Sequence, residues 1–86
     1  MGNAESNYLE ASAAIRTYAI AAGKQPVLPG QILGAREKKE MDESVKFLSK
    51  VLLTDQDKRW LLYDLERELS HLPEVHYKRL RLALKL

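Results

Sequence analysis

The stretch that most constrains the fold of this chain runs from Thr54 to Pro73 and carries one stripe of leucines. Five leucines fall on a single narrow face if the stretch is helical: Leu61, Leu62, Leu65, Leu69 and Leu72. Thr54 with Asp57 three residues later has the order of a capping box, and Pro73 ends the segment. Residues 55–72 are therefore predicted to form a helix that buries one face.

Composition places the chain among small globular domains. Apolar residues make up 45% and charged residues 30% of its 86 residues, a balance typical of chains that fold. Because cysteine is absent, disulfides and thiolate metal sites are excluded, and we expect a reducing, cytoplasmic location. No apolar run approaches the roughly 18 residues that span a bilayer, and no secretory signal is present. We expect one soluble domain over residues 1–86.

Three further helices are predicted. Residues 6–22 are rich in alanine, residues 36–53 join a charged first part to an apolar stripe, and residues 73–85 begin at a proline. The stripe of the second helix is Met41, Val45, Leu48 and Leu52. Residues 78–86 also alternate leucine with other residues, as a strand does, but helix is preferred because Leu, Ala, Lys and Arg are strong helix formers.

The connections between these helices define the predicted bundle. Residues 23–34 carry two prolines and three glycines, so they are predicted to form a loop. The loop is expected either to lie across the bundle with its apolar side chains tucked in or to open and receive a ligand. The junction between residues 36–53 and 55–72 is short, which favours an antiparallel hairpin with facing leucine stripes. The predicted fold is all-α, a compact four-helix bundle-like domain with an apolar Pro/Gly loop between helices 1 and 2.

A second apolar strip is the most informative feature for function. It comprises Leu9 and Ile20 on the first predicted helix, Phe47 and Val51 on the second, and Trp60 and Tyr63 on the third, with Arg67 beside them. Trp, Tyr and Arg are enriched at interaction hot spots. The strip has two interpretations: its helices are buried on two sides within the chain, or it binds another protein.

From this strip we expect a small, non-enzymatic protein–protein interaction module that serves as an adaptor, regulator or structural subunit. The expected interface is Phe47, Val51, Trp60, Tyr63 and Arg67. A homodimer is expected because a chain of this size has few helices with which to cover every apolar face. No small-molecule substrate is expected.

A nucleic-acid-binding regulator is the first alternative. The C-terminal segment carries four basic residues that could grip phosphates: Lys78, Arg79, Arg81 and Lys85. The whole chain has a formal charge of only +2 and a pI of about 9.0, too weak to require a nucleic-acid partner.

An N-myristoylated peripheral membrane protein is the second alternative. The first six residues match M-G-x-x-x-[ST], in which Gly2 accepts the acyl chain. The structural interpretation is that this segment leads into a helix capped by Ser6 or Asn7.

Metal binding and catalysis are not expected. Asp64, Glu68 and His71 share a helix face, and Glu68-x-x-His71 has the spacing of carboxylate-bridged di-iron bundles, but the sequence offers one copy only. We expect these three residues on a solvated face. His76 lies five residues from His71 across a proline, which is not the spacing of a helical ligand pair. No metal or cofactor is predicted.

The segment from Tyr18 to Gly34, with Gly23 and Leu33 between them, resembles in spacing the small all-helical enterobacterial proteins that connect biofilm and acid-resistance signalling. It covers under a quarter of the chain, and the downstream spacing departs from that family by several residues. The resemblance implies a dimeric regulatory protein, and no functional residue is carried over from it.

Overall fold

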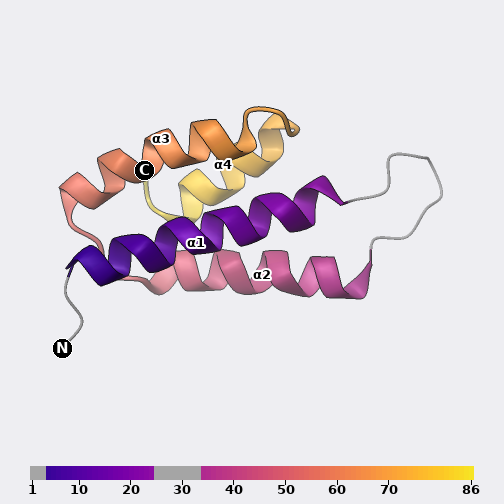
Figure 1. Ribbon diagram of the computed structural model, residues 1–86, viewed down its shortest axis with the longest axis horizontal. Coiled ribbons are helices and arrows are strands. Elements are labelled where there is room, and N and C mark those ends of the chain that lie inside the picture. The colour runs from indigo at the N-terminus through magenta and orange to yellow at the C-terminus, as the bar shows by residue number, and fades with distance from the viewer. Residues whose placement is uncertain (1–3, 25–33) are drawn as a thin grey trace.

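The computed structural model describes residues 4–24 and 34–86, which form four helices and no strand (Figure 1). The helices are α1 (Ala4–Gly23), α2 (Ala35–Lys50), α3 (Asp55–Leu69) and α4 (Glu74–Ala83). The predicted all-α, four-helix class is confirmed, and so is the preference for helix in the C-terminal segment. Gly2 and residues 25–33 of the predicted loop lie outside the described residues.

Local sequence signals set the start of α3. The Thr54 hydroxyl oxygen accepts a hydrogen bond from the backbone N–H of Asp57 at 3.1 Å, and the Thr54 N–H donates to the Asp57 carboxylate at 3.1 Å. This reciprocal pair is the predicted capping box, and it satisfies two backbone donors that the first turn leaves unpaired. At the other end, α3 stops before Pro73, and α4 begins directly after it.

The helix ends lie within three residues of the prediction, and the largest differences are at the C-terminal ends of α2, at Lys50 and not residue 53, and of α3, at Leu69 and not residue 72. α2 stops at Lys50 because Val51 has extended torsions, φ −66° and ψ 139°, so the helical period does not continue and Leu52 is 80% exposed. Its predicted place in the core stripe is wrong. α1 begins at Ala4, and Asn7 does not cap it; instead the Asn7 side-chain amide donates to the Leu52 carbonyl at 2.9 Å.

The order of the helices around the bundle also differs. α1 packs against α2 and α3, and α4 packs against the same two helices from behind (Figure 1). α2 and α3 run antiparallel but lie diagonally opposite each other, so the predicted hairpin with facing stripes is wrong. The extended linker of residues 51–54 spans roughly 13 Å at about 3.3 Å per residue, enough to carry the chain across the end of the bundle.

The core lies where the four helices meet. Three leucines of the predicted stripe, Leu61, Leu65 and Leu69, are buried there. The other two, Leu62 and Leu72, are only partly buried, and Leu72 lies beyond the end of α3. The largest side chains with almost no exposure come from all four helices: Ile15, Tyr18, Leu48, Leu61, Leu65, Leu69 and Leu80. Full burial of each aliphatic side chain stabilises the fold by about 1.5–3 kcal/mol. None of the four described helices has the length and apolar character needed to cross a membrane.

Candidate functional site

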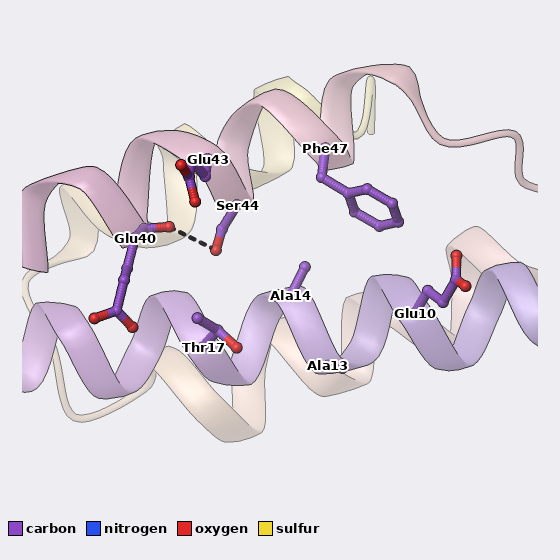
Figure 2. A pocket seen from close by; sticks show the side chains of 8 residues that line it. All are labelled: Glu10, Ala13, Ala14, Thr17, Glu40, Glu43, Ser44 and Phe47. Atoms are coloured by element: carbon purple, nitrogen blue, oxygen red, sulfur yellow. Dashed lines mark hydrogen bonds between the residues drawn. The ribbon is translucent and has the colours of Figure 1, made fainter. Parts of the chain in front are cut away.

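A groove opens on the outer side of α1 and α2 and has a volume of about 460 Å³ (Figure 2). Each helix contributes four residues with i, i+3, i+4, i+7 spacing, and together they form the Phe47 groove: Glu10, Ala13, Ala14, Thr17, Glu40, Glu43, Ser44 and Phe47. Phe47 and Glu10 lie at one end, and Glu40 and Thr17 at the other. The groove exists because small side chains on α1 do not fill the space beside α2.

Phe47 separates this groove from a second hollow. That hollow, of about 350 Å³, is lined by Glu43, Lys46, Phe47, Lys50 and Val51. The Phe47 ring is 37% exposed and is accessible from both sides. Two of the residues predicted as an interface, Phe47 and Val51, therefore lie together in an open apolar depression.

The Phe47 groove is apolar inside and acidic at its edges. Its three charged residues are all carboxylates: Glu10, Glu40 and Glu43. Arg36 contacts Glu40 at 3.4 Å, but its side chain is 88% exposed, so this pair is screened by solvent. The Ser44 hydroxyl donates to the Glu40 carbonyl at 2.8 Å (Figure 2). The alanines and glutamates were not predicted as site residues, although their helical spacing was available in the sequence.

A second exposed surface, the Trp60 patch, lies on α3. Trp60 and Tyr63 are 54% and 67% exposed, their rings lie 6.4 Å apart, and with Gln56 and Arg59 they line a hollow of about 320 Å³. The interpretation that these aromatic residues are buried within the chain is therefore wrong. Because α3 lies diagonally opposite α2, the predicted single strip is divided into the Phe47 groove and the Trp60 patch.

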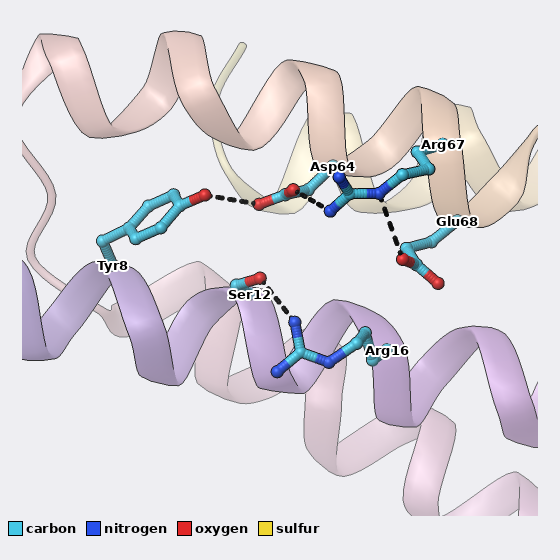
Figure 3. Close-up of polar contacts among 6 residues, drawn as sticks. All are labelled: Tyr8, Ser12, Arg16, Asp64, Arg67 and Glu68. Atoms are coloured by element: carbon cyan, nitrogen blue, oxygen red, sulfur yellow. Dashed lines mark hydrogen bonds and ion pairs between the residues drawn. The ribbon is translucent and has the colours of Figure 1, made fainter.

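Arg67, the fifth predicted interface residue, belongs to a polar seam between α1 and α3 (Figure 3). Its guanidinium contacts the Asp64 carboxylate at 2.6 Å and the Glu68 carboxylate at 3.4 Å. The Tyr8 hydroxyl donates to the other Asp64 oxygen at 2.9 Å. Burial, followed by the hydrogen bond to Asp64, raises the pKa of Tyr8. This seam ties α1 to α3.

Asp64 corrects the predicted solvated face. It is only 4% exposed, because the angle at which α3 meets α1 turns its carboxylate toward Tyr8. A buried carboxylate needs hydrogen-bond donors, and Tyr8 and Arg67 supply them. A tyrosine hydroxyl that is removed from water usually has a hydrogen-bond partner, and Tyr8 finds one in Asp64.

A second buried polar pair joins α1 to α4. The Tyr18 hydroxyl and the His76 Nδ1 lie 2.7 Å apart, and their rings meet edge to face at 5.5 Å. Burial, and then the nearby Arg79 charge, lowers the pKa of His76. Burial likewise raises the pKa of Tyr18. Both groups are therefore held in their neutral forms inside the bundle, where they serve packing and orientation.

The four basic residues of the nucleic-acid alternative do not form one free cluster. Arg79 bonds Asp42 at 2.9 Å and lies over the Tyr18 ring at 5.8 Å, and the hydrogen bond to Asp42 is the main cause of its raised pKa. Lys78 contacts Glu74 at 3.8 Å. Arg81 lies over a tyrosine ring at 6.0 Å, and Lys85 follows the end of α4. Two of the four charges are thus paired with carboxylates.

In the described part of the chain, no three His, Asp or Glu side chains gather closely enough to hold a metal ion. Glu68 is bound by Arg67, and His71 is exposed in the turn after α3. Among residues 4–24 and 34–86, Glu68 and His71 therefore belong to no group of three or more side chains that could hold a metal ion.

The sequence matches no protein-family model, and comparisons with curated proteins and with solved structures give no match. The resemblance of residues 18–34 to a signalling family gains no support from them. The function therefore has to be inferred from the surfaces of the molecule.

Proposed function

We propose that this chain is a small, non-enzymatic protein–protein interaction module that binds a protein segment in the Phe47 groove. The observation that carries the proposal is an open apolar groove, about 460 Å³ in volume, with Phe47 exposed at one end. An apolar hollow rimmed by polar residues is a common feature of protein-binding sites. Such a module can serve as an adaptor, a regulator or a structural subunit. We propose a cytoplasmic location for it.

The shape of the groove favours a helix as the bound segment. It lies between two antiparallel helices and extends for two helical turns, from Glu10 to Thr17 on α1. A helix bound in a groove presents apolar residues at i, i+3 or i+4, and i+7. This spacing matches the spacing of the residues that line the Phe47 groove on each helix. The Trp60 patch adds a second exposed aromatic surface, on another side of the bundle.

The buried polar residues support a structural role for the rest of the molecule. His76 is bound by Tyr18 and Asp64 by Tyr8 and Arg67, so these groups hold helices together and do not face the groove. A general base needs access to a substrate proton. His76 and Asp64 are therefore not available to a substrate in the groove.

Site-specific photo-crosslinking in the producing cell tests the proposal. A benzophenone side chain placed at Phe47 should give a discrete adduct with a protein. The matched control position is Ser49, which is exposed on the same helix but points about 200° away from Phe47. The absence of a protein adduct at position 47, or equal adducts at both positions, would contradict the proposal.

A further inference from the structure

The outer face of α4 has the chemistry that the Phe47 groove requires. Val75 and Leu82 are 63% and 79% exposed on this helix, and Lys78 lies between them. The three residues have i, i+3, i+7 spacing and therefore share one face. The intervening Arg79 is paired with Asp42 of α2 at 2.9 Å.

We propose that the Phe47 groove of one copy receives the outer face of α4 from a second copy of this chain. The inference rests on the proposed function and names the partner of that same site. Charge supports the pairing: the groove edge carries Glu10, Glu40 and Glu43, and the α4 face carries Lys78. The contact of Lys78 with Glu74, at 3.8 Å, is exposed and screened by solvent, so the ammonium group can bind a groove carboxylate instead. Complementary charge favours this pairing and opposes an anionic partner such as a nucleic acid.

Length is the second argument. Val75 and Leu82 are seven residues apart, as are Glu10 and Thr17 on α1 and Glu40 and Phe47 on α2. At 1.5 Å per residue, both the α4 face and the groove therefore extend for about 10.5 Å. One apolar anchor can reach the Phe47 end of the groove while the other reaches the opposite end.

The contact has to form between molecules. α4 packs against α2 and α3 and lies behind α2 when the groove faces the viewer (Figure 2). The groove and the α4 face are thus on different sides of one subunit. Such a contact joins two different surfaces, so it builds chains or rings when it repeats head to tail.

Sedimentation velocity over a concentration series tests this contact. Wild type should show a mass that increases with concentration, and Leu82→Ser should raise the dissociation constant at least about tenfold, since an apolar anchor is worth about 1.5–3 kcal/mol. Leu52→Ser is the matched control, because Leu52 is equally exposed, at 80%, but lies in the linker. An unchanged association in Leu82→Ser, or an equal loss in Leu52→Ser, would overturn the proposal.

A charge-swap pair locates the two surfaces. Glu43→Lys in the groove and Lys78→Glu on α4 should each weaken association about two- to fivefold. A mixture of the two variants should recover it, because each reversed charge then meets an opposite one. Arg59→Glu in the Trp60 patch makes the same charge change as Lys78→Glu and should leave the dissociation constant unchanged. Failure of the mixture to recover association would overturn the pairing.

The two proposals fail in different ways. A wild-type chain that stays monomeric at all concentrations, with a Phe47 photo-adduct to a different protein, would overturn self-association and leave the binding role of the groove intact. A photo-adduct within a single chain would overturn self-association as well, because the occupant would then be a segment of the same molecule. The absence of any adduct at position 47 would contradict the proposal that the Phe47 groove binds a protein segment.

Discussion

The two sides of α1 are closed in different ways. Toward α3, Tyr8 and Asp64 meet in a buried hydrogen bond that Arg67 extends. Toward α2, the alanines at positions 13 and 14 leave the space beside Phe47 open. Directional polar contacts fix the first side, while small side chains leave the second able to accept a partner. In this bundle, the residues that hold α1 to α3 are therefore different from the residues that are available for binding.

The largest expected loss of stability comes from a cavity in the core. Leu65→Ala removes a side chain with 0% exposure, so it should lower the free energy of unfolding by about 2–5 kcal/mol. Phe47→Ala on the open side should cost less than about 1.5 kcal/mol, because the ring is already partly exposed. Urea unfolding monitored by circular dichroism measures both. Equal losses would show that the groove side is as firmly packed as the closed side.

The next effect concerns the polar seam. Asp64→Ala should cost about 1–3 kcal/mol because Tyr8 loses its acceptor in a partly buried position. Tyr8→Phe in the same background should then add little, since the two residues share one interaction. A double-mutant cycle of unfolding free energies checks this. Fully additive losses would mean that the seam does not couple α1 to α3.

A smaller effect is a dependence on pH. Burial lowers the pKa of His76 below its ordinary value of 6.5, so the unfolded chain takes up a proton at a higher pH than the folded protein does. The contribution of neutral His76 to stability is therefore full above pH 6.5 and is lost as the pH falls from 6.5 through the lowered pKa. Thermal unfolding between pH 7.5 and pH 4.5 should show this loss.

His76→Gln should remove that part of the pH dependence. His71→Gln changes the second histidine, which is exposed in the turn after α3, and should retain it. A pH profile that is the same in wild type and His76→Gln would contradict the role assigned to the Tyr18–His76 pair.

The smallest expected effect on stability comes from filling the groove. Ala13→Leu places a large side chain at an exposed position of α1, so the unfolding free energy should change by no more than about 0.5 kcal/mol. Binding at Phe47 should nevertheless be lost, because the added side chain occupies the floor. Sedimentation and photo-crosslinking measure binding. A large change in stability would indicate that the open side is packed after all.

Of the residues that line the Phe47 groove, Phe47 alone is predicted from the sequence as an interface residue. Phe47 and Trp60 were predicted to be available for contacts, and both are exposed. Their separation onto two surfaces was not predictable, because helical periodicity defines the faces of one helix without saying which neighbour covers each face. Asp64 was missed for the same reason, since its burial depends on where α1 lies.

The sequence by itself determined where the helices begin and end to within a few residues. Capping at Thr54, the break at Pro73 and the leucine stripe are local signals that act through neighbours along the chain. The tertiary structure alone decides that α2 and α3 lie diagonally opposite, that a polar seam joins α1 to α3, and that an open groove lies on the outer surface of the packed α1 and α2 helices. The extended linker after Lys50 crosses the end of the bundle, and that path is selected by the packing of all four helices together.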